Sequence, residues 1–337
     1  MAPLFTGSRF GFGLGPLVAA AAPFTPDTGT YLNYGWYGGG APRITSVSRI
    51  DWSSDLSTAS PRSGIDADAT YGGGLSSLSY GWFSGGYNPA FDPSGGRSTV
   101  SRIDYANDLS GSSNRASTPN SSNSRSGGFS NTTYGYWGTG MTGNGGGASS
   151  AVTRVDFAND LTSPANRTNT YSPYINHTGG ASDFSTYGWF AGGQFGGAGG
   201  VTGNPISTIY RLTYASDTSA LSTRGNLSGE STGQASGNKT YFWVAGKDSP
   251  AVSSNIERVT FSSDLATATT RGTLTTARRP SGSGNNTYIW WAAGYNGSAQ
   301  TSIVDRMSYE TDLAASSPRG NLHYSNQVYA TNHMTLG

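Results

Sequence analysis

A pattern of about fifty residues is present in six copies along this chain, and it determines which folds the chain can adopt. In every copy an arginine lies within an apolar run, an aspartate follows six positions later, and a second arginine follows thirteen positions later. Consecutive copies are 47 to 57 residues apart, although the spacing inside each copy is fixed, which is typical of rigid strands joined by variable loops. The first arginines are Arg49, Arg102, Arg154, Arg211, Arg258 and Arg306, the aspartates are Asp55, Asp108, Asp160, Asp217, Asp264 and Asp312, and the second arginines are Arg62, Arg115, Arg167, Arg224, Arg271 and Arg319.

Each copy also carries the hallmarks of four short strands. The segment Ile209 to Tyr214 has bulky side chains at both odd and even positions, which predicts a strand packed on both faces. An aromatic opening such as Tyr187-Gly188-Trp189 precedes it, and the pair Arg224-Gly225 follows it as a shorter strand. The segments before the later openings, at 64–79, 117–133, 169–186, 226–240 and 273–287, are long enough for a fourth strand. No segment has helical periodicity.

Composition excludes several classes of protein. The 337 residues include 50 glycines and only 12% charged residues, but regularly spaced aromatics make up a further 12% and argue against a disordered chain. A net charge of +1 gives no electrostatic footprint for nucleic acid. The chain has no cysteine, and no apolar run reaches the roughly 20 residues of a membrane span.

Six copies of four antiparallel strands predict an all-β protein, a six-bladed β-propeller. The copies resemble kelch repeats, because an aromatic strand ends in a glycine pair and a strand with a polar turn follows. Copies one, two and four keep the pair as Gly38-Gly39, Gly85-Gly86 and Gly192-Gly193, whereas Gly246-Lys247 and Gly294-Tyr295 lack its second member. The resemblance covers about residues 34–333 and implies four-stranded blades.

The ends of the chain suggest how such a ring closes. The tail from His323 to Ala330 begins one more strand with no copy after it, and we expect it to complete the first copy. Residues 1–30 are expected to form an extended arm outside the propeller of 31–337, with an export signal as the alternative. The repeats are expected at about 34–63, 80–116, 134–168, 187–225, 241–272 and 288–320, with a closing strand at 321–333. A seven-bladed ring that takes strands from the arm remains open.

The repeated arginines and aspartates are expected to be structural, because an active site needs one asymmetric set of groups. Each pair can bridge neighbouring strands or blades through a hydrogen-bonded guanidinium. Only His177, His323 and His333 are available as imidazoles, and none of them share a metal-binding spacing. We therefore expect no catalytic residue, no cofactor and no metal site.

Specificity is expected in the loops that follow the glycine pairs, which vary most and should emerge on one face. Aromatic and amide groups there could stack on and hydrogen-bond a glycan. The candidate ligand-binding residues are Tyr87, Asn88 and Phe91 in copy two, Gln194 and Phe195 in copy four, and Tyr295 and Asn296 in copy six.

The low charge, the opening run Gly7-Ser8-Arg9-Phe10-Gly11-Phe12-Gly13 and the blade sequences are similar to kelch-like propellers in virion proteins of marine tailed phages, particularly those that infect cyanobacteria. This resemblance implies a non-enzymatic tail, fibre or capsid-appendage component, located in the extracellular particle. The arm would dock on other virion proteins, copies of the chain would assemble symmetrically, and the ring could bind a host-surface glycan. A secreted or surface lectin-like propeller and a polysaccharide-acting enzyme are the alternatives.

Overall fold

The computed structural model describes residues 32–41, 44–65, 72–86, 98–118, 127–138, 140, 151–169, 175–196, 202–247, 251–325 and 327–330. In these residues the protein is all-β, as the sequence predicts, and forms seven antiparallel sheets, six of four strands and one of three. The helical segments of this part of the chain are single turns of 3-10 helix, and none of them is long enough to cross a bilayer. They are η1 (Trp52–Ser54), η2 (Tyr105–Asn107), η3 (Phe157–Asn159), η4 (Tyr214–Ser216) and η5 (Phe261–Ser263).

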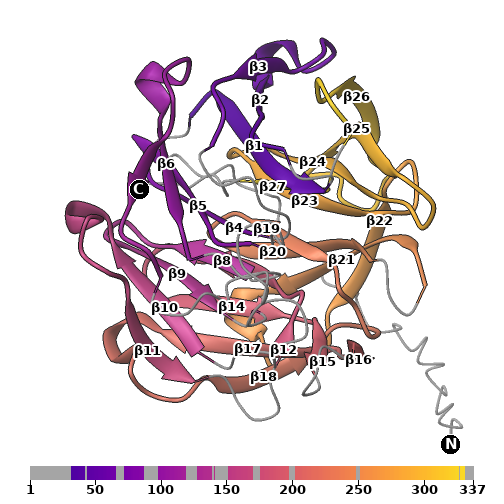
Figure 1. Ribbon diagram of the computed structural model, residues 1–337. Coiled ribbons are helices and arrows are strands. Elements are labelled where there is room, and N and C mark those ends of the chain that lie inside the picture. The colour runs from indigo at the N-terminus through magenta and orange to yellow at the C-terminus, as the bar shows by residue number, and fades with distance from the viewer. Residues whose placement is uncertain are drawn as a thin grey trace, which may run out of the picture.

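The six four-stranded sheets have the same strand order and are set around a common centre, which gives a propeller-like arrangement (Figure 1). We number them sheet 1 (β27-β1-β2-β3), sheet 2 (β4-β5-β6-β7), sheet 3 (β8-β9-β10-β11), sheet 4 (β13-β14-β17-β18), sheet 5 (β19-β20-β21-β22) and sheet 6 (β23-β24-β25-β26). The innermost strands are β27 (Gln327–Ala330), β4 (Gly73–Ser76), β8 (Gly127–Ser130), β13 (Gly179–Ser182), β19 (Gln234–Gly237) and β23 (Arg279–Gly284).

The remaining strands follow outward in the order that the sequence predicts. The second strands, which contain the aromatic openings, are β1 (Tyr34–Ala41), β5 (Tyr80–Ser84), β9 (Tyr134–Gly138), β14 (Tyr187–Ala191), β20 (Tyr241–Lys247) and β24 (Tyr288–Tyr295). The third strands are β2 (Val47–Asp51), β6 (Val100–Asp104), β10 (Ala151–Asp156), β17 (Thr208–Thr213), β21 (Ser253–Thr260) and β25 (Gln300–Ser308). The outermost strands are β3 (Ser60–Arg62), β7 (Ser113–Arg115), β11 (Ala165–Asn169), β18 (Ser222–Asn226), β22 (Thr269–Thr273) and β26 (Ser317–Asn321).

Glycine on the innermost strands allows neighbouring sheets to touch at the centre. A Cβ on Gly128 would lie 2.5 Å from the carbonyl oxygen of Gly74, and a Cβ on Gly180 would overlap the backbone of Gly128. Successive innermost strands contact one another, and β27 contacts both β4 and β23. The centre is therefore packed backbone against backbone, which a larger side chain at these positions would prevent.

The hydrophobic core is divided into six clusters, each of which lies between two neighbouring sheets. Between sheets 2 and 3, for example, Leu75, Trp82 and Val100 pack against Trp137 and Val155. Both faces of the second and third strands are therefore buried, in agreement with the bulky residues at odd and even positions. Stability depends on the contacts between sheets, because no sheet has a core of its own.

The glycine pair at the end of the second strand differs by one position from the sequence expectation in two copies, one position later in the first copy and one position earlier in the sixth. Gly192 and Gly193 have φ values of 63° and 105°, and Ala293 and Gly294 have nearly the same values, 57° and 110°. The sixth copy therefore has Ala293-Gly294 at this position and keeps the second glycine, contrary to our expectation for Gly294-Tyr295. In the first copy the matching pair is Gly39-Gly40, with φ values of 65° and 105°.

Sheet 4 carries the one addition to the repeat among the described residues. The three-stranded sheet has the order β12 (Ile175–Asn176), β15 (Gln194–Gly196) and β16 (Thr202–Pro205), and it extends from the ends of β13 and β14. Its register pairs Ile175 with Phe195 and Asn176 with Gln194. The fourth copy therefore has a strand where the sequence predicted a loop.

The tail and the first repeat belong to the same sheet. Strand β27 pairs with β1 through Tyr37 with Ala330 and Gly38 with Tyr329. Ahead of β27, the Tyr324 hydroxyl oxygen lies 3.1 and 2.8 Å from the carbonyl oxygens of Tyr37 and Ser46, and its one proton can be donated to either. The expected arm, residues 1–30, lies outside the described residues.

Candidate functional site

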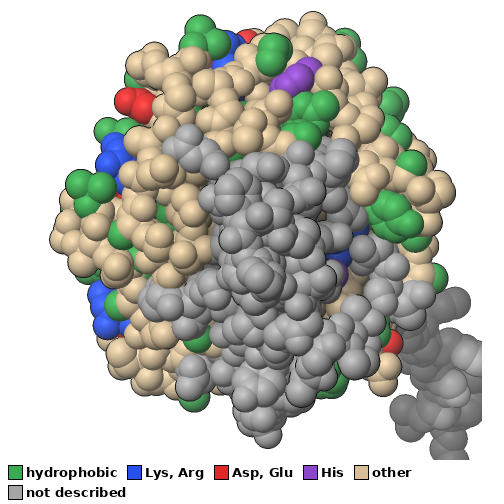
Figure 2. Space-filling model, in the orientation of Figure 1, with side chains coloured by type: hydrophobic (Ala, Val, Ile, Leu, Met, Phe, Trp, Pro, Cys, Tyr) green, Lys and Arg blue, Asp and Glu red, His purple; other side chains and the backbone are tan. Residues whose placement is uncertain are grey.

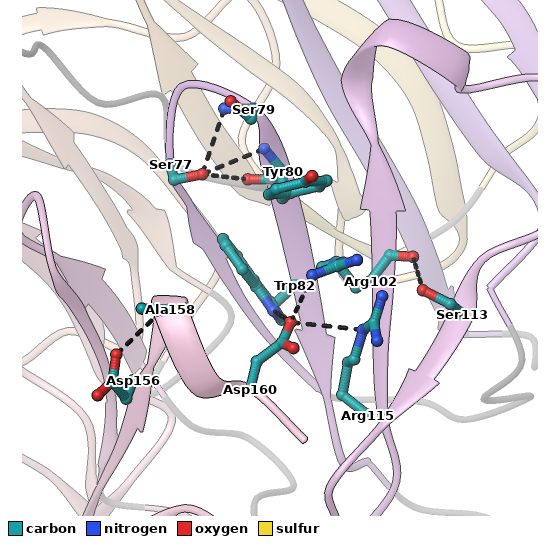
Figure 3. Close-up of polar contacts among 10 residues, drawn as sticks. All are labelled: Ser77, Ser79, Tyr80, Trp82, Arg102, Ser113, Arg115, Asp156, Ala158 and Asp160. Atoms are coloured by element: carbon teal, nitrogen blue, oxygen red, sulfur yellow. Dashed lines mark hydrogen bonds and ion pairs between the residues drawn. The ribbon is translucent and has the colours of Figure 1, made fainter. Parts of the chain in front are cut away.

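The repeated charged residues lie between sheets, and the contact between sheets 2 and 3 illustrates their geometry (Figure 3). The Oδ2 atom of Asp160 accepts a hydrogen bond from Trp82 Nε1 at 2.8 Å and another from Arg102 Nη1 at 3.0 Å. The Nε atom of Arg115 lies 3.4 Å from the same oxygen. Asp160 belongs to sheet 3 and the three donors belong to sheet 2, so a single carboxylate joins the two sheets.

The local sequence explains why this carboxylate is held in place. The Asp156 side chain accepts a hydrogen bond from Ala158 N at 3.0 Å and caps the start of the 3-10 turn η3, and Asp160 is the residue directly after this turn (Figure 3). The first residue of the turn, Phe157, stacks on Trp82 with the ring centroids 4.2 Å apart. One short turn thus presents a ring and a carboxylate to the same tryptophan.

Arg102 is fixed from its own sheet as well. Its guanidinium carbon lies 4.1 Å from the centre of the Tyr80 ring, which is a cation–π contact. The same contact occurs in all six repeats at 4.1 to 4.4 Å. Tyr80 in turn follows a tight turn in which the Ser77 hydroxyl oxygen accepts hydrogen bonds from Ser79 N and Tyr80 N.

The same arrangement recurs at every junction, and each arginine pairs with the aspartate of the following repeat rather than with the one six positions later. In the third repeat the Tyr136 hydroxyl replaces the indole and donates to Asp217 Oδ2 at 3.1 Å. The aspartates are 2 to 7% exposed, so their charges are largely removed from water. The junctions are Trp36, Arg49 and Arg62 with Asp108; Tyr136, Arg154 and Arg167 with Asp217; Trp189, Arg211 and Arg224 with Asp264; Trp243, Arg258 and Arg271 with Asp312; and Trp290, Arg306 and Arg319 with Asp55.

Two of these carboxylates differ in acidity for a geometric reason. Burial raises the pKa of Asp312, and the hydrogen bond from Trp243 and the charge of Arg271, whose Nε is 3.5 Å away, offset it only in part. Burial also opposes ionisation of Asp264, but hydrogen bonds from Arg224 at 2.6 and 2.8 Å and from Trp189 outweigh it and lower the pKa of Asp264. Two N–H donors of Arg224, both directed at Asp264 Oδ1, therefore stabilise the ionised carboxylate more than the single longer contact from Arg271 does.

The candidate ligand-binding residues form three sets, one in each of the second, fourth and sixth copies. Tyr87, Asn88 and Phe91 lie outside the described residues. Gln194 and Phe195 lie in β15, where Gln194 is buried and Phe195 packs on the cluster between sheets 3 and 4. Figure 2 shows the face of the molecule in the orientation of Figure 1.

The candidates of the sixth repeat lie at the hairpin that joins β24 to β25, where Tyr295 is the last residue of β24 and Asn296 begins the turn. The Tyr295 hydroxyl donates to the carbonyl oxygen of Gly297 at 2.7 Å. Tyr295 is also the cross-strand partner of Arg279, the first residue of β23.

A contact that the sequence did not suggest links the candidates of the fourth copy to those of the sixth. Arg279 Nη1 lies 2.7 Å from His177 Nδ1, although the two residues are 102 positions apart. A guanidinium can only donate, so Nδ1 accepts and the imidazole carries its proton on Nε2. His177 follows β12 and has a φ of 60°, which is unusual for a residue other than glycine. This contact connects the additional sheet, with Gln194 and Phe195, to the strand beside Tyr295.

The signal that could have located this asymmetric region is the spacing of the repeats. The step from Arg154 to Arg211, 57 residues, is the longest and contains the additional sheet. His177 itself gave no such signal, because no other copy has a histidine at an equivalent position.

A buried ion pair in sheet 6 is also absent from the repeat pattern. Arg278 and Asp305 are fully buried and 2.9 Å apart. The guanidinium also donates to the carbonyl oxygens of Trp291 and Ala293. Its donors are therefore directed into the protein, and we interpret the pair as structural.

The described residues contain no group of three or more side chains suited to a metal ion, and none of the six innermost strands carries an aspartate or a glutamate. No family model matches the chain, and no curated protein matches it in sequence.

Proposed function

We propose that the chain is a six-bladed, kelch-like β-propeller, closed by its C-terminal strand, that serves as a non-enzymatic structural component of a phage virion. The observation that carries the ring is that Asp55 of sheet 1 accepts from Trp290 and Arg306 of sheet 6, just as every other aspartate accepts from the preceding sheet. The pairing of β27 with β1 supports the same closure.

Deletion of residues 321–337 tests the closure. This change removes β27 and Tyr324, and with them the contacts that join the tail to sheet 1. We expect the melting temperature of the whole protein to fall in a single cooperative transition, measured by circular dichroism. Unchanged cooperative unfolding would contradict closure by the tail.

A scaffolding role is supported by how the repeated polar groups are used. Every aspartate of the repeat is occupied by donors from its neighbour, so these groups hold sheets together and are not directed at a substrate. Such a ring would present variable loops on a rigid frame. In the virion, the arm of residues 1–30 would bind other particle proteins, and copies of the chain would assemble symmetrically.

Mass spectrometry of purified particles tests the virion assignment directly. We expect peptides of this chain in stoichiometric amounts in a tail, fibre or capsid appendage. A matched test compares the full chain with residues 31–337, which should fold normally and fail to assemble on the particle. A gene among metabolic genes, with no product in any particle, would exclude the proposal.

A lectin-like function is the second candidate, and the contact between His177 and Arg279 favours it, because it links Gln194 and Phe195 to the strand beside Tyr295. Binding to a glycan array should then be lost in Tyr295→Ala and retained in Leu56→Ala, which changes an exposed side chain. Equal binding by both variants would argue against this site. A polysaccharide-acting enzyme would instead need turnover and an asymmetric pair of carboxylates.

A further inference from the structure

Four turns of the described chain share one arrangement of hydrogen bonds around an asparagine. In each, the side-chain oxygen accepts from the backbone nitrogens two and three positions later, at 2.7 to 3.0 Å, which is an Asx-turn. The asparagines are Asn131, Asn238, Asn285 and Asn296. They differ in the residue that follows, which is threonine, lysine, asparagine and glycine respectively.

The glycine after Asn296 matters for the reactivity of the side-chain amide. The backbone nitrogen of Gly297 is the group that can close a five-membered ring on Asn296 Cγ, and glycine has no Cβ to obstruct its approach. The amide oxygen accepts from Ser298 N at 3.0 Å and Ala299 N at 2.8 Å. These donors withdraw charge from the carbonyl and stabilise the oxyanion that forms when the carbon is attacked.

We propose that Asn296 is a site of spontaneous deamidation. The Gly297 nitrogen forms a bond to Asn296 Cγ and loses its proton, and the C–N bond of the side-chain amide breaks and releases ammonia. Water then opens the resulting succinimide at either carbonyl, which gives aspartate or isoaspartate. No oxidant, metal or second protein is required.

The Asn296 turn is also more exposed to water than the turns of Asn131 and Asn238. Gly297, Ser298 and Ala299 are exposed at the hairpin tip, whereas Asn131 and Asn238 are buried. Water therefore reaches the Asn296 turn, and the succinimide can hydrolyse there. Asn285 is partly exposed, as Asn296 is, and differs from it in being followed by Asn286.

The two products have different consequences for the hairpin. In sheet 4 the Asp183 side-chain oxygen accepts from Ser185 N and Thr186 N at 3.0 and 2.8 Å, in the same kind of turn. An aspartate at position 296 can therefore keep the turn, while isoaspartate lengthens the main chain by one methylene. Either product adds a negative charge beside Tyr295, the cross-strand partner of Arg279.

The test is peptide mass spectrometry of the folded full-length protein during incubation at mildly alkaline pH. We expect the peptide with Asn296 to gain about one dalton and lose ammonia before the peptides with Asn131, Asn238 and Asn285 react. In Gly297→Ala the rate should fall to that of the Asn285 peptide. Asn144-Gly145 lies outside the described residues and is followed as a separate peptide.

The reciprocal variant keeps the test decisive if Gly297→Ala disturbs the hairpin, in which glycine has a φ of 95°. Asn286→Gly should make Asn285 react at a rate close to that of Asn296. The proposal is overturned if the Asn296 peptide stays unchanged when the protein is folded, or if Asn286→Gly leaves Asn285 as inert as before.

Discussion

The junctions after repeats 4 to 6 have shorter backbone hydrogen bonds than the junctions after repeats 1 and 2. Both groups use the same kinds of side chain. After the second arginine the later repeats have Gly225, Gly272 and Gly320, and the earlier repeats have Ser63, Ala116 and Thr168. The glycine nitrogens donate to the carbonyl oxygen of the next repeat's aspartate at 2.7 to 2.8 Å, whereas Ser63 and Ala116 do so at 3.1 Å.

The cause of this difference is the space left by the missing Cβ. A Cβ on Gly225, Gly272 or Gly320 would overlap a carbonyl oxygen in the turn of the following sheet. The glycine junctions also gain a second short bond, such as Ala268 N to Asn226 O at 2.7 Å, while the matching bond after Ser63 measures 3.3 Å. After Ala116 the equivalent donor position is Pro164, which has no N–H. The same kinds of side chain therefore form each junction, whereas the residue after the second arginine determines how closely the two backbones approach.

The largest loss of stability should come from removing an aspartate, and the loss should be equal after an early repeat and after a late one. Asp108→Ala and Asp312→Ala each leave two arginines and an indole without their acceptor, which should cost about 3–5 kcal/mol. Urea denaturation measures the free energy of unfolding. Leu109→Ala and Leu313→Ala alter the exposed neighbours and should change it by less than about 0.5 kcal/mol. A clear difference between the two aspartates would show that the side-chain contacts are not equivalent.

A smaller loss of stability should distinguish the glycine junctions of the later repeats from the junctions of the earlier ones. In Gly272→Ala the new methyl group must displace the turn that contains Ala314, which should destabilise the protein by about 1–3 kcal/mol. In Ala116→Gly the junction already accommodates a Cβ, so the change should cost about 0.5–1 kcal/mol through backbone entropy alone. If the two substitutions gave equal losses, close approach at the glycine junctions would not be the reason for the difference.

The smallest effect should appear in the pH dependence of two neighbouring junctions. The pKa of Asp264 is lowered on folding, so its stabilisation is present above its unfolded pKa and is lost as pH falls through its folded pKa. The pKa of Asp312 is raised, so its contribution is present at low pH and declines as pH rises through the folded pKa. From neutral pH downward, the deficit of Asp264→Asn relative to wild type should shrink and that of Asp312→Asn should grow. Parallel curves would refute the assigned difference between Arg224 and Arg271.

Much of this fold could be predicted from the sequence because its stabilising groups recur at fixed spacing. The bulky residues of Ile209 to Tyr214 define a strand buried on both faces, and the glycine-rich segments before each aromatic opening contain the innermost strands. The partner of each arginine could not be predicted, because spacing along the chain does not say which neighbouring copy supplies the carboxylate.

The region around the additional sheet could not be predicted, because its contacts do not recur in the other copies. Strand β15 consists of Gln194, Phe195 and Gly196, too few residues to show alternation. The contact between His177 and Arg279 joins positions 102 residues apart that no repeat relates. The alignment of Ala293 with Gly192 depends on backbone φ, which composition does not reveal.

Each junction has two different sides, which bears on how the number of repeats could change. Each unit offers indole and guanidinium groups on one flank and a carboxylate on the other, so a duplicated or deleted unit would still find the complementary flank at the seam. In the proposed closed ring, crowding at the centre would limit the number of units, because the main chains of Gly74, Gly128 and Gly180 already lie against one another. In that ring glycine, rather than the charged residues, would therefore set the circumference.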